Sequence, residues 1–410
     1  MHTFCLENGL RAIVEQRSGT AMAAIAVLYD TGSRDEKRGR TGMAHLFEHI
    51  MFGGTPSVPD YSHAMQLLGG TDNASTSQDN TLYWEVMPAN YLADALALEA
   101  DRLANIAFDP QVLQVQRNVV VEEFKQNYLN RPYGDLSHLI HSLAYSPEHP
   151  YSWPTIGLTP DHILESSDSE LRDWFSSHYA PGTAVVSVTS PHDPGAVEEM
   201  IRDTFGAIAA RKTAGRVLPD PGFPEKEIVH TVHASVPVPR VVTVIPMAPY
   251  GSDDYYAADA ITDILSLGRS SVYQKELVCG SSGLFTSADA SIEGSEGPGL
   301  LVLDATLTRS SETDALKARD MMLSRLRELA DPAAVDPAAV RRTLNQSEAN
   351  AVLGLLSPRA RAARAAKALM RGVSVDHDIL RRRETGIPQI SRTAARLADT
   401  PTVSVIYLPR

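Results

Sequence analysis

The amino-acid sequence predicts an α+β protein built from two related halves. Strand-like and helix-like segments occur in groups rather than in strict alternation, which favours an α+β class over a parallel α/β sheet. An apolar strand, a polar loop and an amphipathic helix follow one another at residues 21–51, and the same order returns at residues 241–267. We therefore expect two homologous α+β domains, of which the second is a diverged copy of the first.

The length of 410 residues exceeds what one hydrophobic core usually organises, since a domain typically has ~100–200 residues. Residues 211–225 contain three prolines, two glycines and mixed charge without an apolar period, which is the composition of an exposed connector. We place a first domain at residues 1–213, a linker at 214–228 and a second domain at 229–410.

The elements of the first half follow from apolar periodicity and from turn residues. Met43, Leu46, Phe47, Ile50 and Met51 recur at helical spacing, and Gly53-Gly54 ends that helix. The other expected elements are a strand over residues 4–15 broken at Asn8-Gly9, a buried strand at 21–29, a polar strand region at 73–87, and helices at 91–106 and 111–129.

Charge and composition exclude several classes of function. The chain has 37 Lys and Arg against 50 Asp and Glu, a net charge of −13, so a nucleic acid is not an expected partner. The Arg/Ala-rich stretch from Ser357 to Arg371 predicts a helix with a solvated basic face. No apolar run approaches the ~18 residues of a membrane span, so we expect no membrane association.

The two cysteines, Cys5 and Cys279, stand in no metal or redox spacing, and we expect both to be structural. Two cysteines without a disulfide framework fit a protein of a reducing compartment. The first residues lack the basic start and apolar block of a signal peptide. We expect a cytoplasmic location, or a periplasmic one if a signal peptide has been removed.

The sequence His45-Leu46-Phe47-Glu48-His49 lies within the first amphipathic helix. At about 100° per residue, Glu48 falls near −60° and His49 near +40° from His45, while the apolar residues fall between about 100° and 240°. All three polar side chains therefore share the face opposite the buried one. Two imidazoles one turn apart can bind one Zn²⁺, with Glu48 close enough to take a proton from water.

A catalytic zinc commonly has three protein ligands, so a third one is needed. Glu123 is the candidate, in the predicted helix over residues 111–129, and Gln116 seven residues earlier shares its face. Glu122 points about 100° away from Glu123, so only one of the two can be a ligand. Helix facing alone does not choose between them.

His-x-x-Glu-His is the inverted zinc motif, and the chain resembles the pitrilysin (insulinase) family, in particular the small bacterial branch that is similar to mitochondrial processing peptidase. The resemblance covers nearly the whole chain. The matching segments are Tyr29 to Ser33, His45 to Thr55, Asn73-Ala74 with Thr81 and Tyr83, Val119 to Phe124, Pro132 to Gly134, and His149 to Tyr151 with Ile156-Gly157.

The resemblance implies a zinc metalloendopeptidase that hydrolyses extended or unfolded peptides, in which the two domains form half of a clam-shell chamber. It implies His45, His49 and Glu123 as zinc ligands and Glu48 as the general base. Asn73 and Ala74 resemble the family's substrate-binding edge strand, which would hold a peptide through backbone hydrogen bonds.

Two departures from the family pattern matter. Gln116 stands where the family usually has an acidic residue that supports the zinc site, so it can hydrogen-bond but adds no charge. In the second half, Val278 and Phe285 stand where the family has an Arg and a Tyr. Neither side chain can donate a hydrogen bond to a developing oxyanion, which could cost several kcal/mol of transition-state stabilisation.

These departures lead to the hypothesis that the chain is the zinc-bearing subunit of a heterodimer. A homologous partner without the zinc motif would supply the Arg/Tyr pair; a homodimer is the other possibility. Two alternatives to a general peptidase stay open: a catalytically silent core or assembly subunit, and a maturation protease dedicated to one small precursor peptide.

Overall fold

The computed structural model describes residues 1–213 and 215–410 and divides them between two compact units that are discontinuous in the sequence. The first unit comprises Met1–Lys125, Trp153–Val217 and Val352–His377, and the second comprises Gln126–Ser152, Leu218–Ala351 and Asp378–Arg410. The boundaries at 1–213, 214–228 and 229–410 stay a prediction for the domains. Ala214, the first residue of the predicted linker, lies outside the described residues.

The first unit is built on a sheet of six strands in the order β1-β2-β6-β3-β5-β4, counted over the described residues. Its central strand β3 is buried along nearly its whole length, as the small apolar residues of 21–29 predict. The strands are β1 (His2–Cys5), β2 (Arg11–Gln16), β3 (Met22–Tyr29), β4 (Thr71–Thr76), β5 (Thr81–Pro88) and β6 (Ala184–Ser190). The helices are α1 (Met43–Ile50), α2 (Tyr61–Leu67), α3 (Leu92–Asn105), α4 (Pro110–Phe124), α6 (Pro160–Leu164), α7 (Asp168–His178), α8 (Pro194–Phe205) and α12 (Pro358–Arg371).

The second unit repeats this design. Within the described residues its sheet has five strands in the order β7-β11-β8-β10-β9, and the pair β7–β11 is parallel like β2–β6, whereas the other pairs of both sheets are antiparallel. The strands are β7 (Ile228–Ala234), β8 (Arg240–Met247), β9 (Phe285–Glu293), β10 (Gly299–Leu307) and β11 (Val403–Pro409). The helices are α5 (Leu136–Ala144), α9 (Asp253–Ser266), α10 (Glu312–Glu328) and α14 (Ile387–Asp399). The shared strand order supports the expected duplication and the α+β class.

Segments that join the two units account for the discontinuity. Helices α11 (Pro337–Gly354) and α13 (His377–Glu384) and the π-helical turn Lys125–Leu129 each contain a unit boundary. Helix α12, from the C-terminal half of the sequence, packs on β3 and β6 of the first sheet, and α5, from the N-terminal half, packs on β11 of the second. Each sheet is therefore completed by a helix that lies far from most of its strands in the sequence.

The expected solvated basic face of the Arg/Ala-rich helix is only partly correct. The small side chains of α12 are buried against the sheet, which lets the helix backbone approach closely. Arg359 stacks over the ring of Trp84 at 4.7 Å, and Arg361 forms an ion pair with Glu15. The long arginine side chains thus anchor the helix to the sheet instead of projecting freely into water.

The placement of α1 depends on a buried carboxylate at its N-terminus. Gly42 supplies no side chain to cap the helix, and Glu36 takes over by accepting hydrogen bonds from the backbone N–H groups of Gly42 and Ala44, both at 2.9 Å. The indole of Trp153 donates a third bond at 3.1 Å. Burial raises the pKa of Glu36 to about 8, while these three hydrogen bonds act in the opposite direction.

The backbone at Gly42 admits only glycine. Its φ is 87°, and a Cβ atom there would lie 2.7 Å from the carbonyl oxygen of Ile156. The other end of α1 is held by its apolar face, since Phe47 is fully buried among the rings of Trp174, Phe175 and Tyr179. The helix is therefore held by the nearby Glu36 together with Trp153 and by the distant aromatic residues around Phe47.

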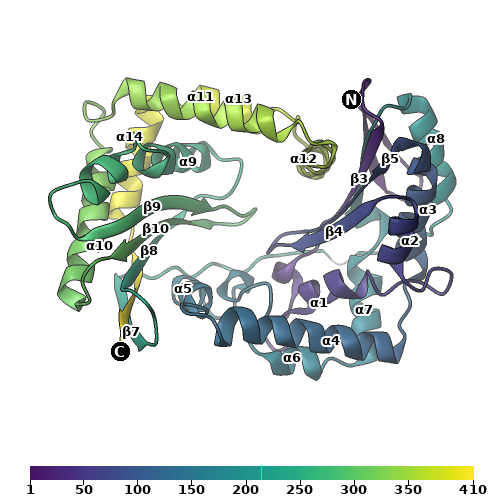
Figure 1. Cartoon of the computed structure of the whole chain (residues 1–410), viewed down its shortest axis with the longest axis horizontal. Coiled ribbons are helices and arrows are strands. Elements are labelled where there is room, and N and C mark those ends of the chain that lie inside the picture. Colours follow the sequence, from purple (N-terminus) through teal and green to yellow (C-terminus); the bar gives the residue numbers. More distant parts are fainter. Residues whose placement is uncertain (214) are drawn as a thin grey trace. The chain divides into compact units, whose positions relative to one another are not determined.

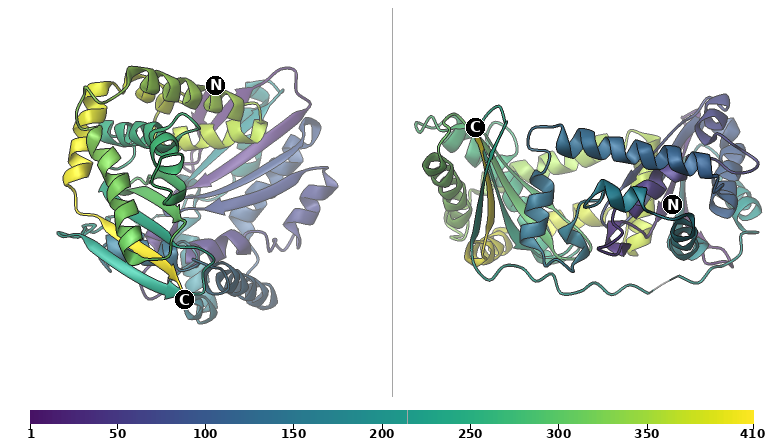
Figure 2. Two further views of the ribbon diagram at one scale, coloured as in Figure 1. Left: turned by 60° about the vertical axis from the view of Figure 1, so that its left-hand side comes forward. Right: turned by 90° about the horizontal axis from the view of Figure 1, so that it is seen from below.

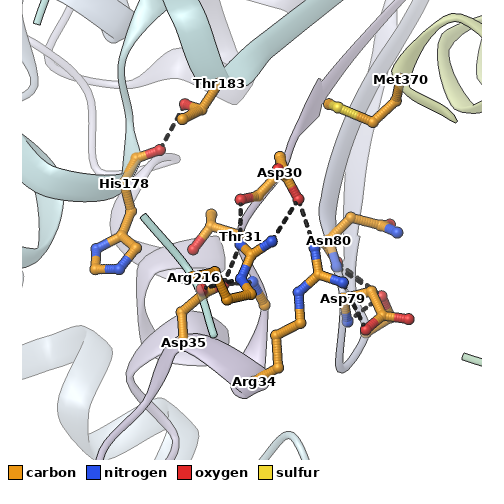
Figure 3. Close-up of polar contacts among 12 residues, drawn as sticks. Asp30, Thr31, Arg34, Asp35, Asp79, Asn80, His178, Thr183, Arg216 and Met370 are labelled. Atoms are coloured by element: carbon orange, nitrogen blue, oxygen red, sulfur yellow. Dashed lines mark hydrogen bonds and ion pairs between the residues drawn. The ribbon is translucent and has the colours of Figure 1, made fainter. Parts of the chain in front are cut away.

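The predicted connector has no helix or strand among residues 211–213 and 215–225, and Figure 2 shows it as an extended trace. It is tied to the first unit by Arg216 (Figure 3), whose guanidinium donates two hydrogen bonds to the carboxylate of Asp35, at 2.6 and 3.0 Å. Arg216 also bonds to Asp30 at 3.1 Å. The fork geometry of arginine suits such a bidentate contact.

Two further expectations concern the surface. Among the described residues, no helix combines the length and apolarity that crossing a membrane requires. Cys5 and Cys279 are both exposed free thiols, so the expectation that they are structural is wrong. Their spacing excluded a disulfide, but it carried no information on burial.

Replacing Glu36 by Ala should destabilise the protein, because two buried backbone N–H groups at the start of α1 lose their acceptor and the Trp153 indole loses one of its two. We expect the free energy of unfolding to fall by roughly 2–4 kcal/mol in urea denaturation. Glu7→Ala is the control, since Glu7 is exposed and forms no hydrogen bond or ion pair within the described residues. Equal stability of the two variants would contradict the capping role.

Candidate metal centre

Three side chains of the first unit bring their ligand atoms to one point. The Nε2 atoms of His45 and His49 lie 3.4 Å apart, and Oε2 of Glu123 lies 3.6 Å from each of them. The two imidazole rings are perpendicular, with centroids 4.9 Å apart. The three residues form a group able to hold a metal ion.

Neighbouring helices supply these ligand atoms. Helices α1 and α4 pack against each other, and Figure 1 shows α4 running alongside α1. In α1 the apolar residues are buried and His45, Glu48 and His49 are half-buried, as the helical period predicts. In α4, Glu123 faces the two histidines, whereas Glu122 is exposed and accepts a hydrogen bond from Lys125 at 2.7 Å. The angular positions on the helix did not decide between Glu122 and Glu123, whereas the packing of α4 against α1 selects Glu123.

The donor set and its spacing fit a zinc ion. Two imidazole nitrogens and one carboxylate oxygen are a common set for catalytic zinc, with bonds of about 2.0–2.2 Å. In a regular tetrahedron, bonds of that length place neighbouring ligand atoms about 3.3–3.6 Å apart. The observed separations of 3.4, 3.6 and 3.6 Å match this edge. The three residues leave the fourth position for water.

The protonation of His45 suits a metal ligand. Burial, and to a smaller extent the neighbouring His49, lowers the pKa of His45 to about 4. The imidazole is therefore neutral near pH 7, and the lone pair on Nε2 is available. Binding a metal at neutral pH would not require this ring to lose a proton.

Glu48 lies beside this group and is held by a hydroxyl. Thr76 at the end of β4 donates a hydrogen bond from Oγ1 to Oε2 of Glu48 at 2.5 Å. Burial raises the pKa of the Glu48 carboxyl, and the Thr76 hydrogen bond opposes that rise. A carboxylate whose proton affinity has been raised beside a ligand cluster is suited to proton transfer.

The predicted support from Gln116 stays a prediction. Gln116 is half-buried on α4 and forms no hydrogen bond within residues 1–213 and 215–410. The second ring nitrogen of His45, Nδ1, is buried and also lacks a partner among the described residues. Histidines that bind a metal usually donate this N–H to an acceptor. Among the described residues, no such acceptor supports His45.

Asn73 and Ala74 lie on β4, an edge strand of the first sheet. They pair with Trp84 and Tyr83 of β5, so the opposite edge of β4 is not occupied by another strand of the described chain. The predicted single polar strand region is in fact a hairpin of β4 and β5 with its turn at residues 77–80. An extended peptide could add to the free edge.

The second unit offers no equivalent group of ligands among the described residues. Val278 and Phe285, which the family resemblance predicts to stand in place of an Arg and a Tyr, belong to its apolar core: Phe285 is 5% exposed and Val278 packs against the same cluster. On α9, Asp259 and Asp263 stand one turn apart and both pair with Arg382. The carboxylates of this helix are therefore engaged in a structural ion pair.

Sequence reasoning missed Thr76 and Glu36. Thr76 lies in a run of Thr and Ser residues, and nothing local marks the one hydroxyl that reaches Glu48. Glu36 lies in a charged loop before α1, where an acidic residue is unremarkable. Gly42, at the start of α1, has no side chain that accepts a hydrogen bond. This was the available sign that another residue must accept hydrogen bonds from the first N–H groups of the helix.

Comparison with known proteins identifies a family for this chain. Residues 11–151 match the family model described as insulinase (peptidase family M16), and residues 167–347 match the model of the peptidase M16 inactive domain. A relative named zinc protease PqqE, from Helicobacter pylori, is 30% identical over 281 residues, which are 67% of this chain and 62% of that protein. The mitochondrial-processing peptidase subunit beta of Blastocladiella emersonii is 27% identical over 205 residues, which are 50% of this chain and 43% of that protein.

The matches thus span about half of the length of these curated relatives. A solved structure of a protease from Helicobacter pylori has a TM-score of 0.88 and 24% identity, covering 100% of this chain and 99% of that one. At this identity the structural likeness concerns the fold alone.

Replacing Glu123 by Gln should lower zinc affinity by at least about a hundredfold, because a neutral amide replaces a charged ligand. Glu122→Gln, the adjacent residue that faces away, should leave the affinity unchanged. The affinities are measured by competition with a chromogenic chelator, and zinc content by elemental analysis. A loss of the same size in both variants, or in neither, would remove Glu123 from the ligand set.

Proposed function

Because the chain belongs to the insulinase family (peptidase family M16), we propose that it is a zinc-dependent endopeptidase that hydrolyses extended peptides. The observation that supports this most strongly is the convergence of His45, His49 and Glu123 beside Glu48. A zinc ion held by these three ligands would supply a Lewis acid that polarises the peptide carbonyl and acidifies a coordinated water.

The chain's own residues supply the proton transfers. Glu48 is the general base: it takes a proton from the attacking water and passes it to the amine of the departing peptide. Its oxygen Oε2 accepts the Thr76 hydroxyl at 2.5 Å, and the backbone N–H of Thr76 also contributes a hydrogen bond to the carboxylate.

The proposed substrate is an unfolded or extended peptide. β4 is an edge strand, and its outer backbone groups beside Asn73 and Ala74 would pair with a substrate backbone once the Asn73 side chain releases the Ala74 N–H, to which it is bonded at 2.7 Å. Recognition through the backbone requires little of the substrate's sequence, and a folded protein rarely presents an extended segment.

We further propose a homologous partner that lacks the zinc motif. In this chain Val278 and Phe285 occupy the positions of the expected Arg and Tyr and are built into an apolar core. They have no group that donates a hydrogen bond to an oxyanion. A partner in a heterodimer, or a second copy in a homodimer, would have to provide such donors, and only the former can carry the Arg/Tyr pair.

The alternative is a catalytically silent assembly subunit. It is favoured by the absence of the Arg/Tyr pair and by the match of residues 167–347 to the inactive-domain model. It leaves the complete set of His45, Glu48, His49 and Glu123 unexplained. A maturation protease for one precursor peptide would use the same chemistry and differ only in its substrate.

Replacing Glu48 by Gln should abolish turnover while zinc remains bound, because Glu48 is not a ligand. We expect kcat on a quenched fluorescent peptide to fall about 10²- to 10⁴-fold, with zinc content unchanged by elemental analysis. Glu122→Gln is again the matched control and should keep full activity. Undiminished turnover by the zinc-loaded Glu48→Gln protein would eliminate the proposed role.

Mixing the chain with a homologue that has the Arg/Tyr pair but no zinc motif should raise peptide hydrolysis by about a hundredfold or more, the usual effect of an oxyanion donor. Substituting that pair in the partner should remove the gain. Equal turnover by the chain alone would count against the heterodimer, and no turnover in any mixture, with zinc bound, would favour the silent subunit.

A further inference from the structure

The geometry points to Thr76 as a positioning residue that holds the Glu48 carboxylate in its working orientation, an inference that rests on the proposed function. The Thr76 hydroxyl donates to Oε2 of Glu48 at 2.5 Å, and both residues are half-buried. A hydrogen bond from a hydroxyl to an ionised carboxylate is among the stronger ones. It fixes one oxygen and so decides where the other one points.

The orientation of Glu48 needs such a constraint. Its side chain has three rotatable bonds and stands on the half-buried face of α1, whereas the apolar side chains of that helix are held by packing. Within the described residues, Thr76 is the one hydrogen-bond partner recorded for the carboxylate. The backbone N–H of Thr76 also contributes a hydrogen bond, so loss of the hydroxyl removes one of the two contacts that select the rotamer.

The hydroxyl itself is rigidly placed. Threonine is β-branched and stiff at χ1. Thr76 is the last residue of β4 and pairs with Thr81 of β5, and the turn that follows is closed by a hydrogen bond from Ser77 N–H to the Asn80 carbonyl at 2.8 Å. Thr81 is buried and donates to the Thr31 carbonyl at 3.0 Å. Backbone pairing therefore sets the position of Oγ1.

The loop before α1 contacts the turn of this hairpin and holds it in place. Arg34 lies between the hairpin and Asp30 (Figure 3): it donates to Asp79 at 2.9 Å from its side chain and to the Gln78 carbonyl at 2.9 Å from its backbone N–H. Its side chain is 2% exposed, so this contact is shielded from water. Gly32 packs so closely that a Cβ would lie 2.5 Å from the Gln78 carbonyl oxygen.

The arrangement predicts which kinetic constant Thr76 affects. Its hydroxyl points to Glu48, and the backbone of β4, which would pair with a peptide, does not depend on that hydroxyl. Loss of the hydroxyl should leave substrate binding intact and impair proton transfer. The change should therefore appear in kcat and not in KM.

The experiment compares Thr76→Val, which keeps the shape and removes the hydroxyl, with Thr76→Ser, which keeps the hydroxyl. Thr3→Val is the matched control, because Thr3 is an exposed residue of β1 at the opposite edge of the same sheet. We expect Thr76→Val to lower kcat at least about tenfold with KM within about twofold, and Thr76→Ser to retain most of the activity. Zinc content and melting temperature should match the wild type in all three.

A second readout does not require turnover. In crystals of the zinc-loaded proteins, the Glu48 carboxylate should occupy one position in the wild type and in Thr76→Ser, and spread over several in Thr76→Val. One unchanged position in Thr76→Val, an unchanged kcat, or equal losses in Thr76→Val and Thr76→Ser would each overturn the inference.

The two readouts separate the possible failures. If the carboxylate spreads in Thr76→Val but the zinc-loaded wild type cleaves no peptide with any partner, the positioning role stands and the proposed function fails. If peptides are cleaved and Thr76→Val changes neither kcat nor the carboxylate, the function stands and the positioning role fails.

Discussion

The buried contact between the Glu36 carboxylate and the N-terminus of α1 is the interaction on which the site depends most directly. Helix α1 is two turns long, too short to be stable alone, and it begins at a glycine that cannot cap it. Glu36 satisfies two of its free N–H groups and joins them to Trp153, more than a hundred residues away. The direction in which His45 and His49 project follows from this anchoring.

The same constraint explains why a short helix can hold two ligands. Its apolar face is enclosed by aromatic rings of α7, and its polar face is left to α4 and β4. Glu123 and Thr76 come from those two elements and approach α1 from different directions. In the proposed site, the third ligand and the residue that orients the base therefore come from different elements of the first unit.

The two units share one architecture, but only the first has the group of candidate metal ligands among the described residues. Five strands of the first sheet have the same order as the second sheet, but in the second unit the carboxylates of α9 form ion pairs and Phe285 lies in the core: Asp259 and Asp263 both pair with Arg382. Such groups stabilise a fold without offering a site to a ligand. This asymmetry underlies the proposal that a partner chain supplies hydrogen-bond donors to the site.

The sequence by itself determined everything that depends on local periodicity. It predicted the α+β class, the buried strand β3, the duplication, and the shared face of His45, Glu48 and His49, because a helix fixes the angle between residues three and four apart. Only the tertiary structure shows that Glu123, and not Glu122, faces the two histidines and that Thr76 contacts Glu48. It also shows that Glu36 accepts hydrogen bonds at the N-terminus of α1 and that α12 packs on the first sheet. Those outcomes depend on how elements far apart in the chain rotate and pack against each other, and no local pattern encodes that rotation.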